Sequence, residues 1–264
     1  MTGSSSRRAG LVVSLVLAAT AAQPRGAAGQ SAPVAHENLK ILPQDIPQPQ
    51  LLQTMQALAQ GLGVPCGYCH APAPAVDGGR GAGGRGRGGP PALDFASDEK
   101  PAKRAAREMM LIVRDINARV PAAVVKGADA TVRVGCATCH RGVAIPRLLP
   151  DILGDTVAAR GTAAAIGQYK DLRKQYFGAQ AYDFSETSLL TVAQRAATPA
   201  DTIAWLRLNL DYFPFSSRTY AALAQAQQRQ NDRNAALASL TRAVELDAQN
   251  AQIKAQLDQL RDGK

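Results

Sequence analysis

Two short segments of the chain each place two thiols and an imidazole close together in sequence. They contain all four cysteines and two of the three histidines. The Cys-x-x-Cys-His pattern is typical of covalent haem attachment, in which the thiols bond the porphyrin and the adjoining histidine binds the iron. We therefore predict two covalently bound c-type haems. The predicted thioether and proximal iron ligands are Cys66, Cys69 and His70 for the first haem, and Cys136, Cys139 and His140 for the second.

Three other uses of paired cysteines compete with this interpretation. A four-cysteine zinc site gives no reason for a histidine directly after both pairs. Two disulfides would each close a very small, strained loop. A thioredoxin-like redox pair normally stands alone in a β-α-β pattern, which the sequence does not indicate. Haem attachment therefore remains the favoured chemistry.

The sixth ligand of each iron decides between an electron carrier and a catalyst with an open iron site. Methionine is the obvious candidate, because the chain has only four, and Met55 and Met109 each lie upstream of one motif. A methionine on an apolar helix face is also a common core residue, so this alternative stays open. Met110 and His36 are the less favoured candidates for a sixth ligand.

Two predicted helices position these methionines. The first spans about residues 49–60, where Leu51, Met55, Leu58 and Leu62 form one apolar stripe. The second begins with Ser97 or Asp98 as N-cap and continues to about residue 119, with Met109 at the centre of its apolar stripe. Each methionine thus lies on an apolar helix face that precedes a Cys-x-x-Cys-His segment.

The cysteine-free remainder of the chain is predicted to be helical. One helix is expected over 162–176, and a 34-residue period relates Leu210-Asp211-Tyr212-Phe213-Pro214 to Val244-Glu245-Leu246-Asp247-Ala248. This period resembles the tetratricopeptide repeat (TPR), with one good repeat, a degenerate one before it and a capping helix. A generic helical bundle is the alternative.

The N-terminus has the three parts of a secretory signal. Arg7 and Arg8 precede a 12-residue apolar run and a small-residue stretch, so the chain is predicted to be exported to the periplasm. The alternative is an uncleaved helix associated with the membrane. Much of the formal charge of +9 lies in this signal and in a glycine-arginine loop at 72–92, predicted to be a flexible surface segment. Nucleic-acid binding is therefore not expected.

Several further segments carry a family resemblance. Asn38 to Pro43, Met55 to His70, Phe95 to Lys100, Arg107 to Asn117 and Cys136 to Gly142 together resemble the cytochrome c subunit of photosynthetic reaction centres. The resemblance implies that Met55 pairs with His70 on the first iron, and Met109 with His140 on the second. It also implies redox partners in a membrane complex. That subunit carries four haems and this chain has two motifs, so the chain resembles half of one.

These observations predict a mainly α-helical chain, with a multihaem cytochrome c domain followed by a TPR-like domain. The expected function is single-electron transfer between redox proteins, with a haem peroxidase or a TPR scaffold as alternatives. The TPR-like region is expected to bind a protein partner or a second copy. The predicted boundaries are 1–29 for the signal, 30–160 for the dihaem domain, 161–184 for a helical linker and 185–264 for the repeats.

Overall fold

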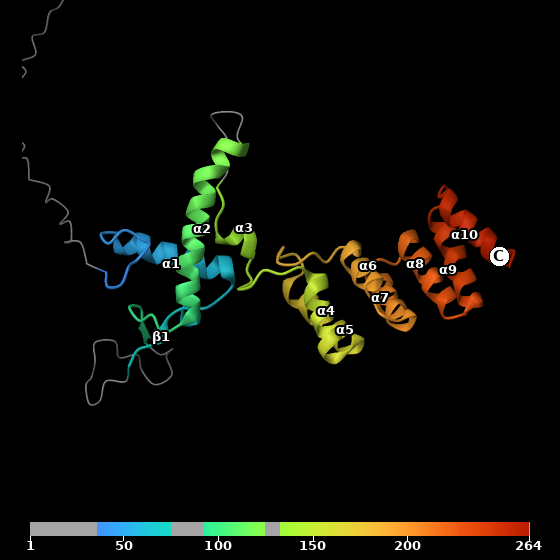
Figure 1. Cartoon of the computed structure of the whole chain (residues 1–264), viewed down its shortest axis with the longest axis horizontal. Helices are drawn as coiled ribbons and strands as arrows, with labels where there is room; N and C mark the ends of the chain where they lie inside the picture. Colours follow the sequence, from blue (N-terminus) through green and yellow to red (C-terminus); the bar gives the residue numbers. More distant parts are fainter. Residues whose placement is uncertain (1–35, 75–91, 125–132, 264) are drawn as a thin grey trace, which may run out of the picture.

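The computed structural model describes residues 36–74, 92–124 and 133–263. Within these ranges the chain is mainly α-helical, as predicted, with ten α-helices, one 3-10 helix and one two-stranded antiparallel sheet. Figure 1 shows α1, α2 and α3 gathered at one end, and α4 to α10 continuing away from them as an array of packed helices. The predicted signal at 1–29 and most of the predicted glycine-arginine loop lie outside the described residues.

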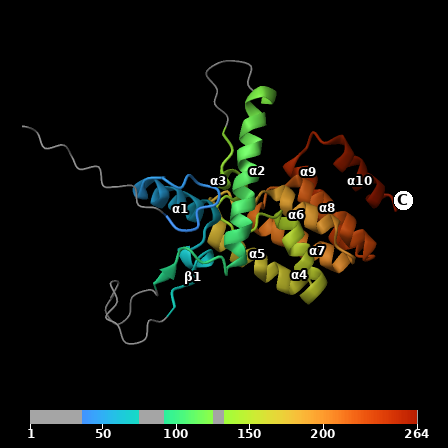
Figure 2. The ribbon, with the colours of Figure 1, turned by 60° about the vertical axis from the view of Figure 1, so that its left-hand side comes forward.

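The region up to residue 148, here called the motif region, contains both Cys-x-x-Cys-His segments. Figure 2 shows the long helix α2 standing beside α1 and α3. In chain order the elements are α1 (Gln48–Leu62), the 3-10 helix η1 (Cys66–Tyr68), β1 (Ala71–Pro72), β2 (Leu93–Asp94), α2 (Pro101–Val124) and α3 (Cys136–His140). The strands pair Ala71 with Asp94 and Pro72 with Leu93.

The start of α2 differs from its prediction. The helix begins at Pro101, so neither Ser97 nor Asp98 is its N-cap. The Asp98 carboxylate instead accepts hydrogen bonds from Lys40 (2.6 Å) and Arg107 (2.8 Å), which occupy its oxygens. Proline suits the first turn of a helix, because the N–H that it lacks would have no helical partner there.

The helical array from residue 149 onward is a series of helices that pack mostly on their neighbours along the chain. Its elements are α4 (Leu149–Arg160), α5 (Thr162–Tyr176), α6 (Glu186–Gln194), α7 (Pro199–Tyr212), α8 (Ser217–Arg229), α9 (Arg233–Leu246) and α10 (Ala251–Arg261). The predicted helix at 162–176 coincides with α5. The array also includes α4, a helix that the sequence patterns did not predict.

The last four helices repeat with a period of 34 residues. Both α7 and α9 contain 14 residues, and their starts at Pro199 and Arg233 are 34 positions apart. The same interval separates the starts of α8 and α10. All four helices begin with a polar N-cap side chain that accepts a backbone N–H, which satisfies one of the free donors of the first turn. The TPR resemblance itself stays a prediction.

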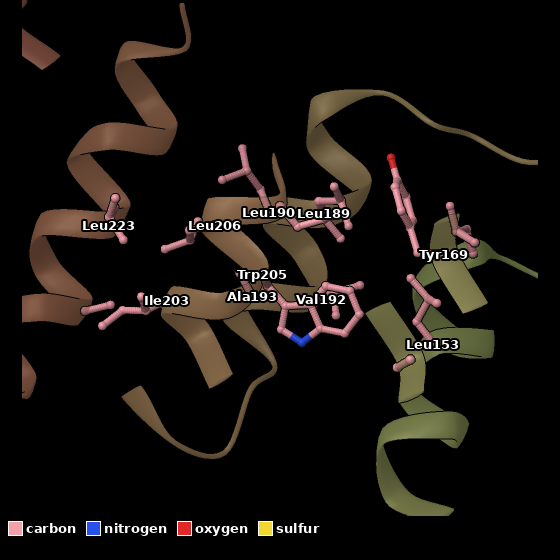
Figure 3. Packing of buried hydrophobic residues seen from close by; sticks show 14 of the residues in the cluster. Leu153, Tyr169, Leu189, Leu190, Val192, Ala193, Ile203, Trp205, Leu206 and Leu223 are labelled. Carbon is pink, nitrogen blue, oxygen red and sulfur yellow. The ribbon is translucent and has the colours of Figure 1, made fainter. Parts of the chain in front are cut away.

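The helices of the array form hydrophobic cores among themselves. Trp205 and Tyr169, which are 1% and 0% exposed, are the largest side chains of a cluster that extends from α4 to α8. Figure 3 shows the labelled side chains of this cluster pointing toward one another from neighbouring helices. A second cluster, which includes Leu240 and Leu257, joins α8, α9 and α10. Among the described residues, no helix has the length and apolar character needed to cross a membrane.

Candidate functional site

The first Cys-x-x-Cys-His segment follows directly from the end of α1. Gly63 ends the helix in the left-handed conformation, with φ of 65°. The backbone amides of Cys69 and His70 then both donate to the carbonyl of Cys66, at 3.2 and 3.1 Å. These bonds wind the segment into one tight turn, which carries both thiols and the imidazole.

His70 is half-buried and its ring lies against an aromatic side chain. The ring centroids of His70 and Phe95 are 4.9 Å apart in an edge-to-face arrangement. The Nδ1 atom is buried and has no hydrogen-bond partner in the described parts of the chain. Burial lowers the pKa of His70, and the positive charges of Lys103 and Arg107 lower it further. The neutral imidazole, which is the form that binds metals, is therefore favoured.

The second segment forms the short helix α3. The Gly135 amide donates to the Thr138 hydroxyl at 3.0 Å, which closes the start of this turn. At its end, Nδ1 of His140 lies 3.0 Å from the carbonyl oxygen of Val143. A hydrogen bond from Nδ1–H to a carbonyl fixes the ring orientation and leaves Nε2 as the nitrogen available to a metal.

The four thiols are all free. Burial raises the pKa of Cys69, with a smaller contribution from the neighbouring Cys66, and burial also raises the pKa of Cys136. In the described ranges, no group of three or more His, Cys, Asp or Glu side chains gathers at a spot that could hold a metal ion. The geometry therefore does not provide the four-cysteine zinc site considered from the sequence.

The helix α2 presents an apolar stripe that no other part of the described chain fully covers. Met109, Ile112 and Ile116 are 42%, 48% and 36% exposed. Their spacing places them on one face of the helix. The side chain of Met110 is only partly exposed. An exposed apolar stripe of this kind is a surface that a large apolar ligand can cover.

The other predicted sixth ligands lie near the start of the described chain. Met55 is half-buried on α1, where Leu52 is 54% exposed one turn away. Nε2 of His36 lies 2.9 Å from the carbonyl oxygen of Ile46, so this histidine is engaged with the backbone. The pairing of Met55 with His70 and of Met109 with His140 stays a prediction.

A single asparagine of α2 holds the chain that enters the second segment. The Asn117 side chain donates to the carbonyl of Val134 and accepts from its amide, with both distances at 2.8 Å. Val134 lies two residues before Cys136. The helix that carries Met109 therefore also fixes the entrance to the second segment.

A charged cluster holds the loop before α2. Lys103 is 9% exposed and donates to the carbonyl oxygens of Phe95, Ala96 and Ser97, at 2.9, 3.1 and 2.7 Å. Asp98 forms ion pairs with Lys103 at 3.3 Å and with Arg107 at 2.8 Å. Because this loop carries the ring that contacts His70, the cluster positions one wall of the first segment.

The back of α3 faces the helical array. Cysteine and histidine side chains occupy one side of this helix, so Ala137, Thr138 and Arg141 must project from the other side, given about 100° per residue. These three residues line an open cleft of about 510 Å³. Gln180, Tyr182 and Asp183 line its opposite wall.

The sequence predicted candidate haem ligands among the cysteines, histidines and methionines, but not the residues that position them. Asn117 and Asp98 lie inside segments that carried the family resemblance, so the resemblance was the available signal for them, whereas Lys103 lies between two of those segments. Their partners could not be read from local patterns. The contact of Asn117 with Val134, for example, joins α2 to the loop before α3.

The residues present fit a c-type haem. Each segment offers two free thiols beside an imidazole, the stripe on α2 offers an apolar surface, and His140 is oriented through Nδ1. In comparisons with known proteins, a model of the family described as "Photosynthetic reaction centre cytochrome C subunit" matches residues 11–198. No match was found among the curated proteins.

Proposed function

The chain belongs to the photosynthetic reaction centre cytochrome C subunit family, whose model matches more than half of its length, and from this premise we propose that it is a periplasmic dihaem electron carrier. The family supports a c-type cytochrome that carries electrons. Two haems, export to the periplasm and the individual iron ligands are our proposals. The bound haems supply reversible one-electron iron chemistry.

One observation carries this proposal. Both Cys-x-x-Cys-His segments form a tight turn with two free thiols and an imidazole. Two such turns in one chain suit two covalent attachments. The stripe of Met109, Ile112 and Ile116 would cover an apolar macrocycle and keep water from it, with Met109 as sixth ligand. We assign Met55 the equivalent role for His70.

Partners follow from the same premise. The family implies redox partners in a membrane complex, and we propose that a protein donor and a protein acceptor exchange electrons with this chain. We further propose that the helical array, with its 34-residue period, offers a docking surface for such a partner or for a second copy.

The proposal is tested by spectroscopy of the full chain matured in a host that attaches haem to exported proteins. Mass spectrometry should show two haems per chain, and the reduced spectrum should stay unchanged under carbon monoxide. Fewer than two haems would overturn the dihaem assignment. Carbon monoxide binding by the parent chain would overturn the carrier assignment in favour of an open-iron enzyme.

Two neighbouring methionines give a matched test of the ligand. Met109→Ala should lower one reduction potential and open that iron to carbon monoxide, because a water or vacancy replaces the thioether. Met110→Ala removes the same side chain one position along α2 and should leave both properties as in the parent. The reverse result would assign the ligand to Met110, and no change in either variant would refute methionine ligation from α2.

A further inference from the structure

The end of α1 is bonded to the second Cys-x-x-Cys-His segment, although the helix leads into the first. The last carbonyls of a helix have no partner inside it. At α1, the turn at Gly63 satisfies those of Ala59 and Gln60, as in a Schellman motif. The next carbonyl, that of Gly61, accepts the backbone N–H of Gly142 at 3.0 Å. A segment 81 positions away thus caps α1.

The close contact leaves no room for a side chain at position 61 or 63. Gly61 is buried, and a Cβ atom there would lie 3.1 Å from the Ala137 nitrogen and 3.2 Å from Cβ of Cys136. A Cβ atom on Gly63 would overlap the carbonyl of Gly142, and the left-handed φ of 65° is itself unfavourable for other residues. The backbones of α1 and α3 therefore meet directly.

The bonded turn is the one that orients the second imidazole. Gly142 lies between His140 and Val143, and the Val143 amide donates to the His140 carbonyl at 3.0 Å. The Val143 carbonyl in turn lies 3.0 Å from Nδ1 of His140. A short series of contacts thus joins the Gly61 carbonyl to the ring of the second proximal histidine.

The two roles of α1 occupy different faces. At about 100° per residue, Gly61 is about 120° around the helix from Met55. The side with Gly61 packs on the second segment, so the side that carries Met55 lies away from that contact. The tertiary contacts agree, because α1 packs against α3.

We propose that Gly61 and Gly63 are positioning residues for His140, so that α1 serves both haem sites. The inference rests on the proposed dihaem function. A carbonyl partner on Nδ1 orients a ligating histidine and raises its basicity, which tunes the metal. Displacing the turn at 140–143 should therefore change the potential of the second haem, although the substitution lies on the helix before the first.

The test compares two glycine-to-alanine substitutions inside helices. The Cβ atom added by Gly61→Ala would contact α3, whereas the Cβ atom added by Gly154→Ala in α4 would contact nothing within 4 Å. The second haem is identified in a Cys66→Ala/Cys69→Ala background, which can retain only that haem. In this background, Gly61→Ala should change the ratio of reduced to oxidised haem at a fixed potential by about threefold. For a one-electron couple this corresponds to a shift of roughly 30 mV in the reduction potential. Gly154→Ala should leave the ratio unchanged.

A second measurement needs no substitution. In the parent chain with both haems, the Gly142 amide should exchange with solvent at least tenfold more slowly than an exposed amide, because Gly61 accepts it. Fast exchange of Gly142, or an unchanged ratio in Gly61→Ala, would overturn the inference. Failure of the proposed function is distinct, since the parent chain would then carry fewer than two haems.

Discussion

The motif region and the helical array differ in how much of their apolar surface they bury. Both hydrophobic clusters lie entirely at or beyond residue 149. Before that position, only Ala71 and Val143 are fully buried apolar residues within the described chain. The same region exposes most of the large apolar side chains that reach solvent, namely Leu52, Tyr68, Phe95, Met109, Ile112, Ile116, Ile145 and Leu148.

Directed polar contacts give the motif region its shape instead. The ion pairs of Asp98, the paired hydrogen bonds of Asn117 and the contact of Gly61 with Gly142 each join a helix to a loop or turn outside it. Such contacts fix geometry, but they contribute less to stability than a packed core does. The comparison teaches that the apolar surface of the motif region needs a bound cofactor to cover it, while the array buries most of its own.

The largest expected effect comes from removing the attachment points. Replacing all four cysteines by alanine should abolish covalent haem, and the exposed stripe on α2 should then lose its cover. Hydrogen exchange of α1 and α2 should become faster in this variant, while α6 to α9 keep the protection of the parent. Unchanged protection of α2 would show that the motif region folds independently of haem, which would break the comparison.

The next effect addresses the array alone. Trp205→Ala removes a side chain that is 1% exposed and should cost about 3–5 kcal/mol of unfolding free energy. Circular dichroism should show earlier melting of the helices, whereas the haem absorption of the motif region should survive to its parental temperature. Phe215→Ala is the control, because this ring is 76% exposed and its loss should change stability by less than about 0.5 kcal/mol.

A third prediction concerns the charged cluster. Hydrogen bonds from Arg107 and Lys40 hold the pKa of Asp98 well below its ordinary value, with a smaller contribution from Lys103. A carboxyl group with a depressed pKa stabilises the folded state at pH values above its ordinary pKa. This stabilisation is lost as the pH falls toward the pKa that the group has in the folded chain. Asp98→Asn should therefore weaken the protection of β2 at pH 7.

The pH dependence supplies the control for this substitution. The difference between parent and variant in hydrogen exchange of β2 should shrink from about pH 5 downward, as the carboxyl group becomes protonated in the unfolded chain. An undiminished difference at low pH would show that shape, and not the charge of Asp98, holds the loop before α2.

The smallest effect is expected for a cation–π contact inside the helical array. The guanidinium of Arg173 lies 4.1 Å from the ring centre of Phe177 and 4.2 Å from that of Tyr212, and it donates to the Phe184 carbonyl at 3.2 Å. Arg173→Lys keeps the charge but loses the planar stack, which should cost about 1 kcal/mol. An unfolding midpoint in urea for Arg173→Lys equal to that of the parent would show that the planar stack does not contribute to stability.

Local patterns in the sequence predicted local structure well. The apolar stripe around Met55 predicted α1 to within two residues at each end, since apolar periodicity acts within a few turns. The 34-residue repeat predicted helices where α7 to α10 lie. The four cysteines and two histidines could be predicted as haem ligands because the pattern for that chemistry lies in adjacent positions.

Long-range contacts could not be predicted in this way. Asp98 looked like an N-cap, because a single sequence does not show that Lys40 and Arg107 occupy its carboxylate. The helix α4 has weak amphipathic patterning, and only tertiary packing against α5 and α6 gives it a buried side. The hydrogen bond from Gly142 to Gly61 joins two glycines that lie far apart in the sequence.

The pairing of β1 with β2 makes this part of the chain a convenient place for protein engineering. The Ala73 amide donates to the Ala92 carbonyl at 2.8 Å, so the two ends of the intervening segment are already held side by side. When the ends are fixed, each doubling of the length between them costs only about 0.6 kcal/mol in closure entropy. An affinity tag or a fluorescent label inserted there would therefore leave the attachment turns on either side in register.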